Sequence, residues 1–165
     1  MLPFLKKVRE VRRPHCTALV AAAGSSQRMG GVNKLLQPLG GVPVLVRTLE
    51  ALQAAEGVDE VIVAAREADI LEISQICRTY GISKCSKVIR GGTNRVHSVL
   101  LAALEAAPEA ELLAVHDGAR PLATPELIDR VIAAAARCAA AVPAVAVKDT
   151  VKTFREDGGV EETLD

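Results

Sequence analysis

The stretch AAAGSSQRMGGVNK, residues 21–34, combines glycines and serines with two cations in a pattern suited to phosphate. Glycine and serine let backbone N–H groups turn toward an anion, and Arg28 and Lys34 can reach into the same space. Five residues separate Gly24 from the next glycine, where a P-loop has four, and Ser26 stands where a dinucleotide fingerprint needs glycine. We therefore expect a phosphate loop of another kind; the alternative is a surface loop with solvated cations.

Two later loops carry further polar residues. The sequence RGGTNRVHS, residues 90–98, joins a glycine pair to Arg95 and Ser98, although a glycine pair before a helix is often only a turn. The sequence HDGARP, residues 116–121, puts Asp117 at the end of an apolar run. A carboxylate there is costly to bury unless it is paired or binds a metal, so Asp117 is the candidate metal ligand. The alternative is an aspartate that accepts hydrogen bonds from its own loop.

No side chain is placed as a nucleophile beside a base. His116 adjoins Asp117 but should point to the opposite face of its strand, and His15 and His97 lack the partners of a triad. Ser98 at a helix start is typical of a capping or ligand-contacting hydroxyl. The residues therefore favour anion and metal binding without a covalent intermediate.

The elements that must position these loops alternate along the chain. Short apolar runs predict five strands, at residues 17–23, 59–65, 86–90, 111–117 and 141–147. Between them, periodic apolar residues predict four helices: one opened by Pro43 with a stripe of Leu45, Leu49 and Leu52; one over 67–80 ended by Gly81; one with a stripe of Val96, Val99, Leu100, Ala103 and Leu104; and one capped by Thr124, with the alanines of 133–141 in its interior.

This alternation predicts one α/β domain with a mostly parallel sheet between two layers of helices, a three-layer α/β/α, Rossmann-like fold. Ligands of such folds bind at the carboxyl ends of the strands, an edge called here the rim. The three loops all follow strands at that edge. We therefore expect them to converge on one site.

Composition narrows the class of protein. The 165 residues suffice for one domain, and with no Trp, one Tyr and two Phe the chain lacks the aromatic platforms of single-stranded nucleic-acid binders. Twenty basic residues balance twenty acidic ones, so no overall field attracts nucleic acid or an anionic membrane. The four cysteines form no C-x-x-C pair and suggest reduced, buried thiols of a cytoplasmic protein. Residues 1–16 are expected to form a basic, disordered or loosely docked tail, with the domain at 17–165.

The motifs AAAGSSQRM with Lys34, GG-x-x-R-x-x-S, HDGARP and VKDTVK, in this order, resemble the 2-C-methyl-D-erythritol 4-phosphate cytidylyltransferases, members of the sugar nucleotidyltransferase superfamily. The resemblance implies transfer of CMP from CTP to that sugar phosphate, with pyrophosphate released, in non-mevalonate isoprenoid biosynthesis. It also implies in-line attack of the sugar phosphate on the α-phosphorus of CTP. A ribitol-5-phosphate cytidylyltransferase is the nearest alternative. The preference for CTP over UTP stays open.

The resemblance also assigns roles to residues. It places Arg28 and Lys34 on the triphosphate as catalytic cations, Asp117 on Mg²⁺, and Thr150 in the sugar-phosphate pocket of a neighbouring subunit. Contacts with the nucleotide are implied for Ala22, Ala23, Gly24, Gly92, Thr93, Ser98 and Arg120. Thr150 belongs to a β-arm that begins near residue 148 and turns at 156–159, so a homodimer with composite sites is implied.

Three departures from the family pattern are visible. Leu35 and Leu36 follow the loop lysine where the family often has Gln and an aromatic residue, and Thr93 stands where some members have Asp. Family members continue beyond the position of Asp165, so a member incomplete at its C-terminus is expected, with a silent CTP-binding or dimerisation fragment as the alternative.

Overall fold

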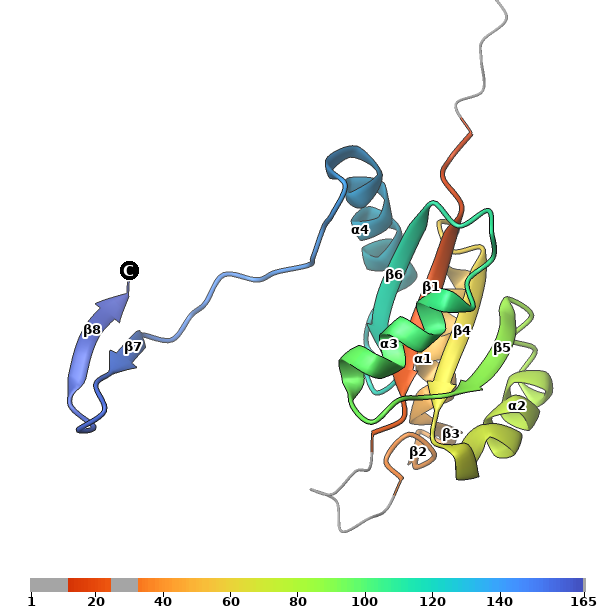
Figure 1. Ribbon diagram of the computed structural model, residues 1–165, viewed down its shortest axis with the longest axis horizontal. Helices are drawn as coiled ribbons and strands as arrows, with labels where there is room; N and C mark the ends of the chain where they lie inside the picture. The colour runs from red at the N-terminus through yellow and green to blue at the C-terminus, as the bar shows by residue number, and fades with distance from the viewer. Residues whose placement is uncertain (1–11, 25–32, 165) are drawn as a thin grey trace, which may run out of the picture.

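The computed structural model describes residues 12–24 and 33–164. Its centre is a four-stranded sheet in the order β5-β4-β1-β6 (Figure 1). These strands are β1 Cys16–Ala22, β4 Glu60–Ala65, β5 Cys85–Arg90 and β6 Leu112–Asp117. All three strand pairings are parallel, as expected for strands joined by helical crossovers. The carboxyl ends of the four strands therefore lie at one rim.

Helices cover both faces of this sheet, which confirms the three-layer α/β/α prediction. They are α1 Val44–Ala54, α2 Ile70–Thr79 after a 3₁₀ turn η2 at Glu67–Asp69, α3 Arg95–Leu104 and α4 Pro125–Cys138. The larger apolar cluster joins one face of β1 and β4 to α1, α2 and α4, and a smaller cluster joins the other face to α3. Figure 1 shows α3 in front of the sheet and α1 behind it.

The leucine stripe predicted for α1 is confirmed, because Leu45, Leu49 and Leu52 are fully buried. The loop before α1 contains a short hairpin of β2 Pro38–Leu39 and β3 Val42–Pro43. Its two connecting glycines both have positive φ, the backbone that a tight two-residue turn requires.

Helix α3 forms where the sequence predicts it, but only Val99 and Ala103 of the predicted apolar stripe pack against the smaller cluster. Val96, Leu100 and Leu104 are 76%, 55% and 74% exposed, whereas Ser98 and Ala102 are buried. Small side chains on the inner face let the helix lie close to the apolar residues of β1 and β4. The periodicity therefore predicted the helix correctly, but the larger apolar side chains of the stripe lie on its exposed face.

The chain after α4 differs from the prediction. The helix ends at Cys138, where Ala139 has a φ of 67°, so the alanines beyond it lie outside the helix. The strand predicted at 141–147 is wrong: this segment has no regular structure and its residues are exposed, Val145 among them. Pro143 removes one backbone donor, and no described strand pairs with the run.

The β-arm is confirmed as a hairpin. Strands β7 Val151–Phe154 and β8 Val160–Leu164 pair in antiparallel fashion around a turn whose Gly158 has a φ of 84°. Figure 1 shows the hairpin at the end of an extended segment, away from the sheet and its helices. A lone two-stranded hairpin is marginally stable in water.

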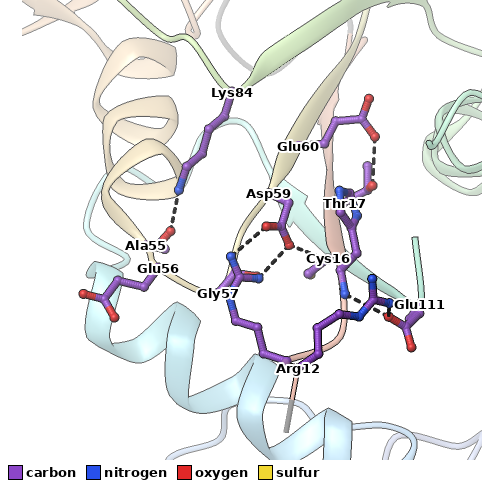
Figure 2. A network of polar contacts seen from close by, with 12 residues as sticks. Arg12, Cys16, Thr17, Ala55, Glu56, Gly57, Asp59, Glu60, Lys84 and Glu111 are labelled. Carbon is purple, nitrogen blue, oxygen red and sulfur yellow. Dashed lines mark hydrogen bonds and ion pairs between the residues drawn. The ribbon is translucent and has the colours of Figure 1, made fainter. Parts of the chain in front are cut away.

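The amino ends of the strands, opposite the rim, are fixed by polar contacts (Figure 2). Arg13 donates two hydrogen bonds of 2.7 Å to Asp59, and the Cys16 N–H donates to the same carboxylate. The contact with Arg13 holds the pKa of Asp59 below its ordinary value. Arg12 pairs with Glu111 at 2.6 Å. Residues 12–16 are therefore attached to the domain, and β1 begins at Cys16, one residue before the predicted start.

The cysteines differ in environment. Cys16 and Cys77 are buried, as predicted for all four, but Cys85 is half-buried and Cys138 is exposed at the end of α4. Among residues 12–24 and 33–164, every helix is too short or too polar to cross a lipid bilayer.

We expect Leu49→Ala to lower the free energy of unfolding by about 2–5 kcal/mol, because it leaves a cavity between α1 and the sheet. Leu104→Ala on the exposed face of α3 is the matched control and should change it by less than about 0.5 kcal/mol. Urea unfolding of both variants measures the difference. Equal effects would mean that α1 does not pack as described.

Candidate active site

The loops that follow β1, β5 and β6 meet at the rim through their described residues. A Cβ atom built on Gly91 of the second loop would lie 2.4 Å from the Ala23 side chain of the first loop, so only glycine fits there. In the third loop, Gly118 donates a hydrogen bond of 3.0 Å to the Ala21 carbonyl at the end of β1. The predicted convergence of the three loops is therefore confirmed for their described residues.

The residues expected along the nucleotide lie at the end of β1. Ala22 is buried, Ala23 is half-buried and Gly24 is exposed. Since the Ala22 side chain belongs to the core, only its backbone could contact a ligand. Arg28 lies outside the described residues.

Lys34 is exposed at the far end of the first loop, and its neighbours tie that end to the rim. Asn33 donates a hydrogen bond of 2.9 Å to Asp69, which follows β4. Arg66 holds the same carboxylate with bonds of 2.6 and 3.1 Å. The sequence analysis missed the anchor formed by Asn33, Asp69 and Arg66. Arg66 and Asp69 are three positions apart, but Asn33 lies 36 positions before Asp69, so no local motif signals that contact.

The second loop is shaped by Ser98 and Asn94. The Ser98 hydroxyl donates to the Asn94 carbonyl at 2.8 Å and accepts from the Gly92 N–H at 3.0 Å, and the Asn94 side chain caps α3. A Cβ on Gly92 would fall 2.3 Å from the His97 ring. Ser98 thus positions the loop from beneath, and Thr93 is among its exposed residues.

Asp117 lies at the tip of β6 between two arginines. Arg95 Nε donates to one carboxylate oxygen at 2.8 Å and Arg120 Nε donates to the other at 2.9 Å. Burial raises the pKa of Asp117, but the two guanidinium hydrogen bonds outweigh this effect and hold the pKa below its ordinary value. Arg95, which sequence reasoning noted without assigning a role, therefore joins Arg120 at the site.

His116 takes no part in this cluster. In the β1–β6 register it lies opposite Val20, on the face covered by α1 and α4, while Asp117 lies opposite Ala21. Its ring Nδ1 is 3.0 Å from the Asp117 carbonyl oxygen, and burial lowers its pKa. The prediction that His116 points away from Asp117 is confirmed.

The residues at the rim suit a divalent cation that is bound mainly by a substrate. Among the described residues, no cluster of three or more His, Cys, Asp or Glu side chains could form a complete metal cage. Mg²⁺ commonly takes one or two carboxylates together with phosphate oxygens and water, and Asp117 offers such a carboxylate. A cation that binds one oxygen of Asp117 would compete with the arginine on that oxygen and leave the other arginine in place.

Thr150 is not brought to the rim in its own chain. It is exposed immediately before β7, in the segment that extends away from the sheet.

Comparison with known proteins places this arrangement in a class. The chain superimposes on 4-diphosphocytidyl-2C-methyl-D-erythritol synthase from Anaerococcus prevotii with a TM-score of 0.78 and 29% identity, covering 93% of this chain and 66% of that one. A nucleotidyl transferase from Methanothermobacter thermautotrophicus gives a TM-score of 0.57 and 27% identity, over 72% of this chain and 57% of that one. The fold and its strand-tip loops are those of a nucleotidyltransferase.

Within that class, the chain belongs to the 2-C-methyl-D-erythritol 4-phosphate cytidylyltransferase family, whose model matches residues 16–165. Its relative of that name from Microcystis aeruginosa is 42% identical over 149 residues, which are 89% of this chain and 66% of the relative. The relative from Dehalococcoides mccartyi strain CBDB1 is 38% identical, over 89% of this chain and 64% of its own length. The chain thus spans just under two thirds of the relatives it matches.

We expect Asp117→Asn to lower the free energy of unfolding at pH 7 by about 1 kcal/mol or less, because Asp117 is partly exposed and its partners are exposed arginines. A carboxylate with a lowered pKa stabilises the fold above its unfolded pKa and loses that contribution as pH falls through the folded pKa. The difference between wild type and variant should therefore begin to shrink below about pH 4 and continue to shrink as the pH falls through the lower folded pKa of Asp117.

Urea unfolding from pH 3 to pH 8 measures this difference. Asp157→Asn, in the exposed turn of the arm, is the control and should leave stability unchanged at every pH. A pH-independent difference for Asp117→Asn would contradict the ion-pair account.

Proposed function

We propose that this protein transfers CMP from CTP to 2-C-methyl-D-erythritol 4-phosphate and releases pyrophosphate. The observation that carries the proposal is the convergence of three loops on the rim of a chain that matches this family from residue 16 onward. The same loops present cations and one carboxylate, the groups that a triphosphate with a divalent metal requires.

The reaction needs positioning and charge stabilisation more than covalent chemistry. A phosphate oxygen of the sugar attacks the α-phosphorus of CTP in line, the bond to the β-phosphate oxygen breaks, and pyrophosphate leaves with the electron pair. No side chain has to form a covalent intermediate. The described residues accordingly include no hydroxyl or thiol paired with a base at the rim.

Arg28 and Lys34 are proposed to bind the triphosphate and to stabilise charge that develops on the leaving pyrophosphate. Arg95 and Arg120 each contact Asp117 through Nε, so their terminal nitrogens can face a phosphate. Ala23, Gly24 and Thr93 would border the nucleoside. Asp117 would hold the Mg²⁺, which supplies Lewis-acid charge neutralisation when bound.

The arm is proposed to complete the site of a second subunit. Val151, Phe154, Val160 and Leu164 are all substantially exposed on a hairpin that packs chiefly on itself. Exposed apolar side chains on an extended arm are typical of a surface that packs against another protein chain. Thr150 at its base would then reach the sugar phosphate bound by the other chain, which makes the protein a homodimer with composite sites.

The direct test mixes the purified chain with CTP, Mg²⁺ and 2-C-methyl-D-erythritol 4-phosphate and measures pyrophosphate release, with ribitol 5-phosphate and UTP as comparison substrates. Release with CTP and the methylerythritol phosphate alone supports the proposal. Thermal stabilisation by CTP and Mg²⁺ without any pyrophosphate release would instead indicate a nucleotide-binding fragment. The absence of both release and stabilisation would overturn the proposed site.

Lys34→Ala should lower turnover by about 10²–10³-fold, the cost of removing one group that stabilises transition-state charge, with a smaller loss of CTP affinity. Arg137→Ala removes an exposed cation in the last turn of α4. It is the control and should leave both turnover and CTP affinity unchanged. Steady-state kinetics and CTP titration distinguish the two effects. Unchanged turnover in the Lys34 variant would remove Lys34 from the chemistry.

Phe154→Glu should shift the protein from dimer to monomer, because it places a charge on the apolar side of the arm. Leu122, which lies before α4, is 86% exposed. Leu122→Glu is the matched control and should leave the molar mass of the protein in solution unchanged. Sedimentation equilibrium measures both. A wild-type monomer at every concentration would contradict the arm as a dimer contact.

A further inference from the structure

A pair of thiols lies on the far side of the domain from β6, where α2 covers the edge strand β5 (Figure 1). Cys77 in α2 and Cys85 at the start of β5 have their sulfur atoms 3.6 Å apart. Both side chains line a cavity of about 490 Å³, together with Ser74, Arg78, Ser83 and Ser86. None of the loops at the rim lines this cavity, so it is separate from the proposed active site.

The chain between the two cysteines is folded to bring them together. The Ile82 N–H donates to the Cys77 carbonyl at 2.8 Å, and the Cys85 N–H donates to the Ile82 carbonyl at 3.2 Å. Gly81, with a φ of 66°, makes the turn out of α2. These contacts fix the two thiols as neighbours in the folded protein, although they are eight positions apart in sequence.

The start of β5 can adjust. Val61 pairs with Cys85 and Ile62 pairs with Lys87, so Ser86 is an extra residue in the pairing of β4 with β5. Such bulges bend an edge strand and redirect its side chains. A disulfide needs a sulfur–sulfur distance of about 2.05 Å, so the two sulfur atoms must approach by roughly 1.5 Å. The glycine turn on one side and the bulge on the other give the segment room for that movement.

The two thiols differ in reactivity. A hydrogen bond with the Cys85 thiol lowers the pKa of Cys77, whereas the same contact and burial raise the pKa of Cys85. Cys77 is 6% exposed and reaches solvent through the cavity, while Cys85 is half-buried. The thiolate is the reactive form, so the lowered pKa of Cys77 favours Cys77 as the attacking group and Cys85 as the resolving group.

We propose that Cys77 and Cys85 form a dithiol site that reduces peroxides and closes to an intramolecular disulfide. The Cys77 thiolate attacks one peroxide oxygen, the O–O bond breaks, and hydroxide leaves and is protonated to water, which gives a sulfenic acid on Cys77. The Cys85 sulfur then attacks the Cys77 sulfur and loses its proton, the S–O bond breaks, and a second water leaves. Two thiols and one hydrogen peroxide become one disulfide and two waters.

Peptide mapping after oxidation tests the linkage. A Cys138→Ser protein, which lacks the exposed thiol, is treated with one equivalent of hydrogen peroxide, alkylated and digested with trypsin. Cleavage after Arg78 and Lys84 puts the two cysteines on separate peptides, so a linked pair that has lost two hydrogen atoms identifies the bond. We expect this pair to be the product, with Cys16 still free to be alkylated after unfolding.

Further substitution of either Cys77→Ser or Cys85→Ser should abolish the linked peptide, while Cys16→Ser should leave its yield unchanged. The proposal is overturned if both thiols stay alkylatable in excess peroxide. It is also overturned if Cys77 proceeds to sulfinic acid without forming the link.

Phenylarsine oxide gives a readout that requires no oxidation. Its arsenic bonds both sulfur atoms and releases one water, so the folded protein should take up one equivalent. Each single serine variant should bind it about 100-fold more weakly, because the two-point attachment is lost. Thermal unfolding of each variant verifies that it is folded. Equal affinity of wild type and single variants would show that the two thiols do not act together.

Discussion

The parallel pairing of β1 with β4 on one side and β6 on the other is the constraint on which the site depends. In this register Ala22 lies opposite Ala65 and Ala21 lies opposite Asp117, so the three strands end at the same level. The second loop leaves β5, whose Arg90 lies opposite Ala65 at the end of β4, and it reaches the same rim, as the contact between Gly91 and Ala23 illustrates. Hydrogen bonding of the sheet thus decides the geometry of residues that are far apart in the chain.

Charge at the rim is arranged as a set of pairs. Asp117 is shared by Arg95 and Arg120, and Asp69 is shared by Arg66 and Asn33. Both aspartates orient flexible groups before any ligand arrives, and such ordering lowers the entropic cost of binding. In the proposed reaction, a triphosphate with its metal would exchange these internal pairs for contacts of the same type, which avoids leaving a desolvated charge without a partner.

Sequence patterns predicted what depends on local periodicity. The stripe of α1 and the strand run of β4 follow from residues close together, and both form at the predicted places. The Gly91–Gly92 pair and Asp117 were identified because glycine and a terminal carboxylate are unusual after buried strands. The joint position of these residues at one rim followed from the parallel topology alone.

What the sequence did not predict depends on partners distant in the chain. The run 141–147 has the composition of a strand, but a strand exists only when a neighbour supplies its hydrogen bonds. The stripe of α3 indicated a helix but not which side packs, because the sheet beneath favours the small side chains of Ser98 and Ala102. The roles of Arg95 and Asn33 likewise required coordinates, since each bonds a residue at least 22 positions away.

The outer margin of β6 has a consequence for how the sheet can be extended. Within the described residues β6 pairs only with β1, so its other side offers a row of backbone N–H and C=O groups beside the half-exposed Leu113 and Val115. An open margin of this kind is a template onto which a foreign strand can add. A strand that adds there would extend the sheet beyond β6 and give its free backbone groups partners.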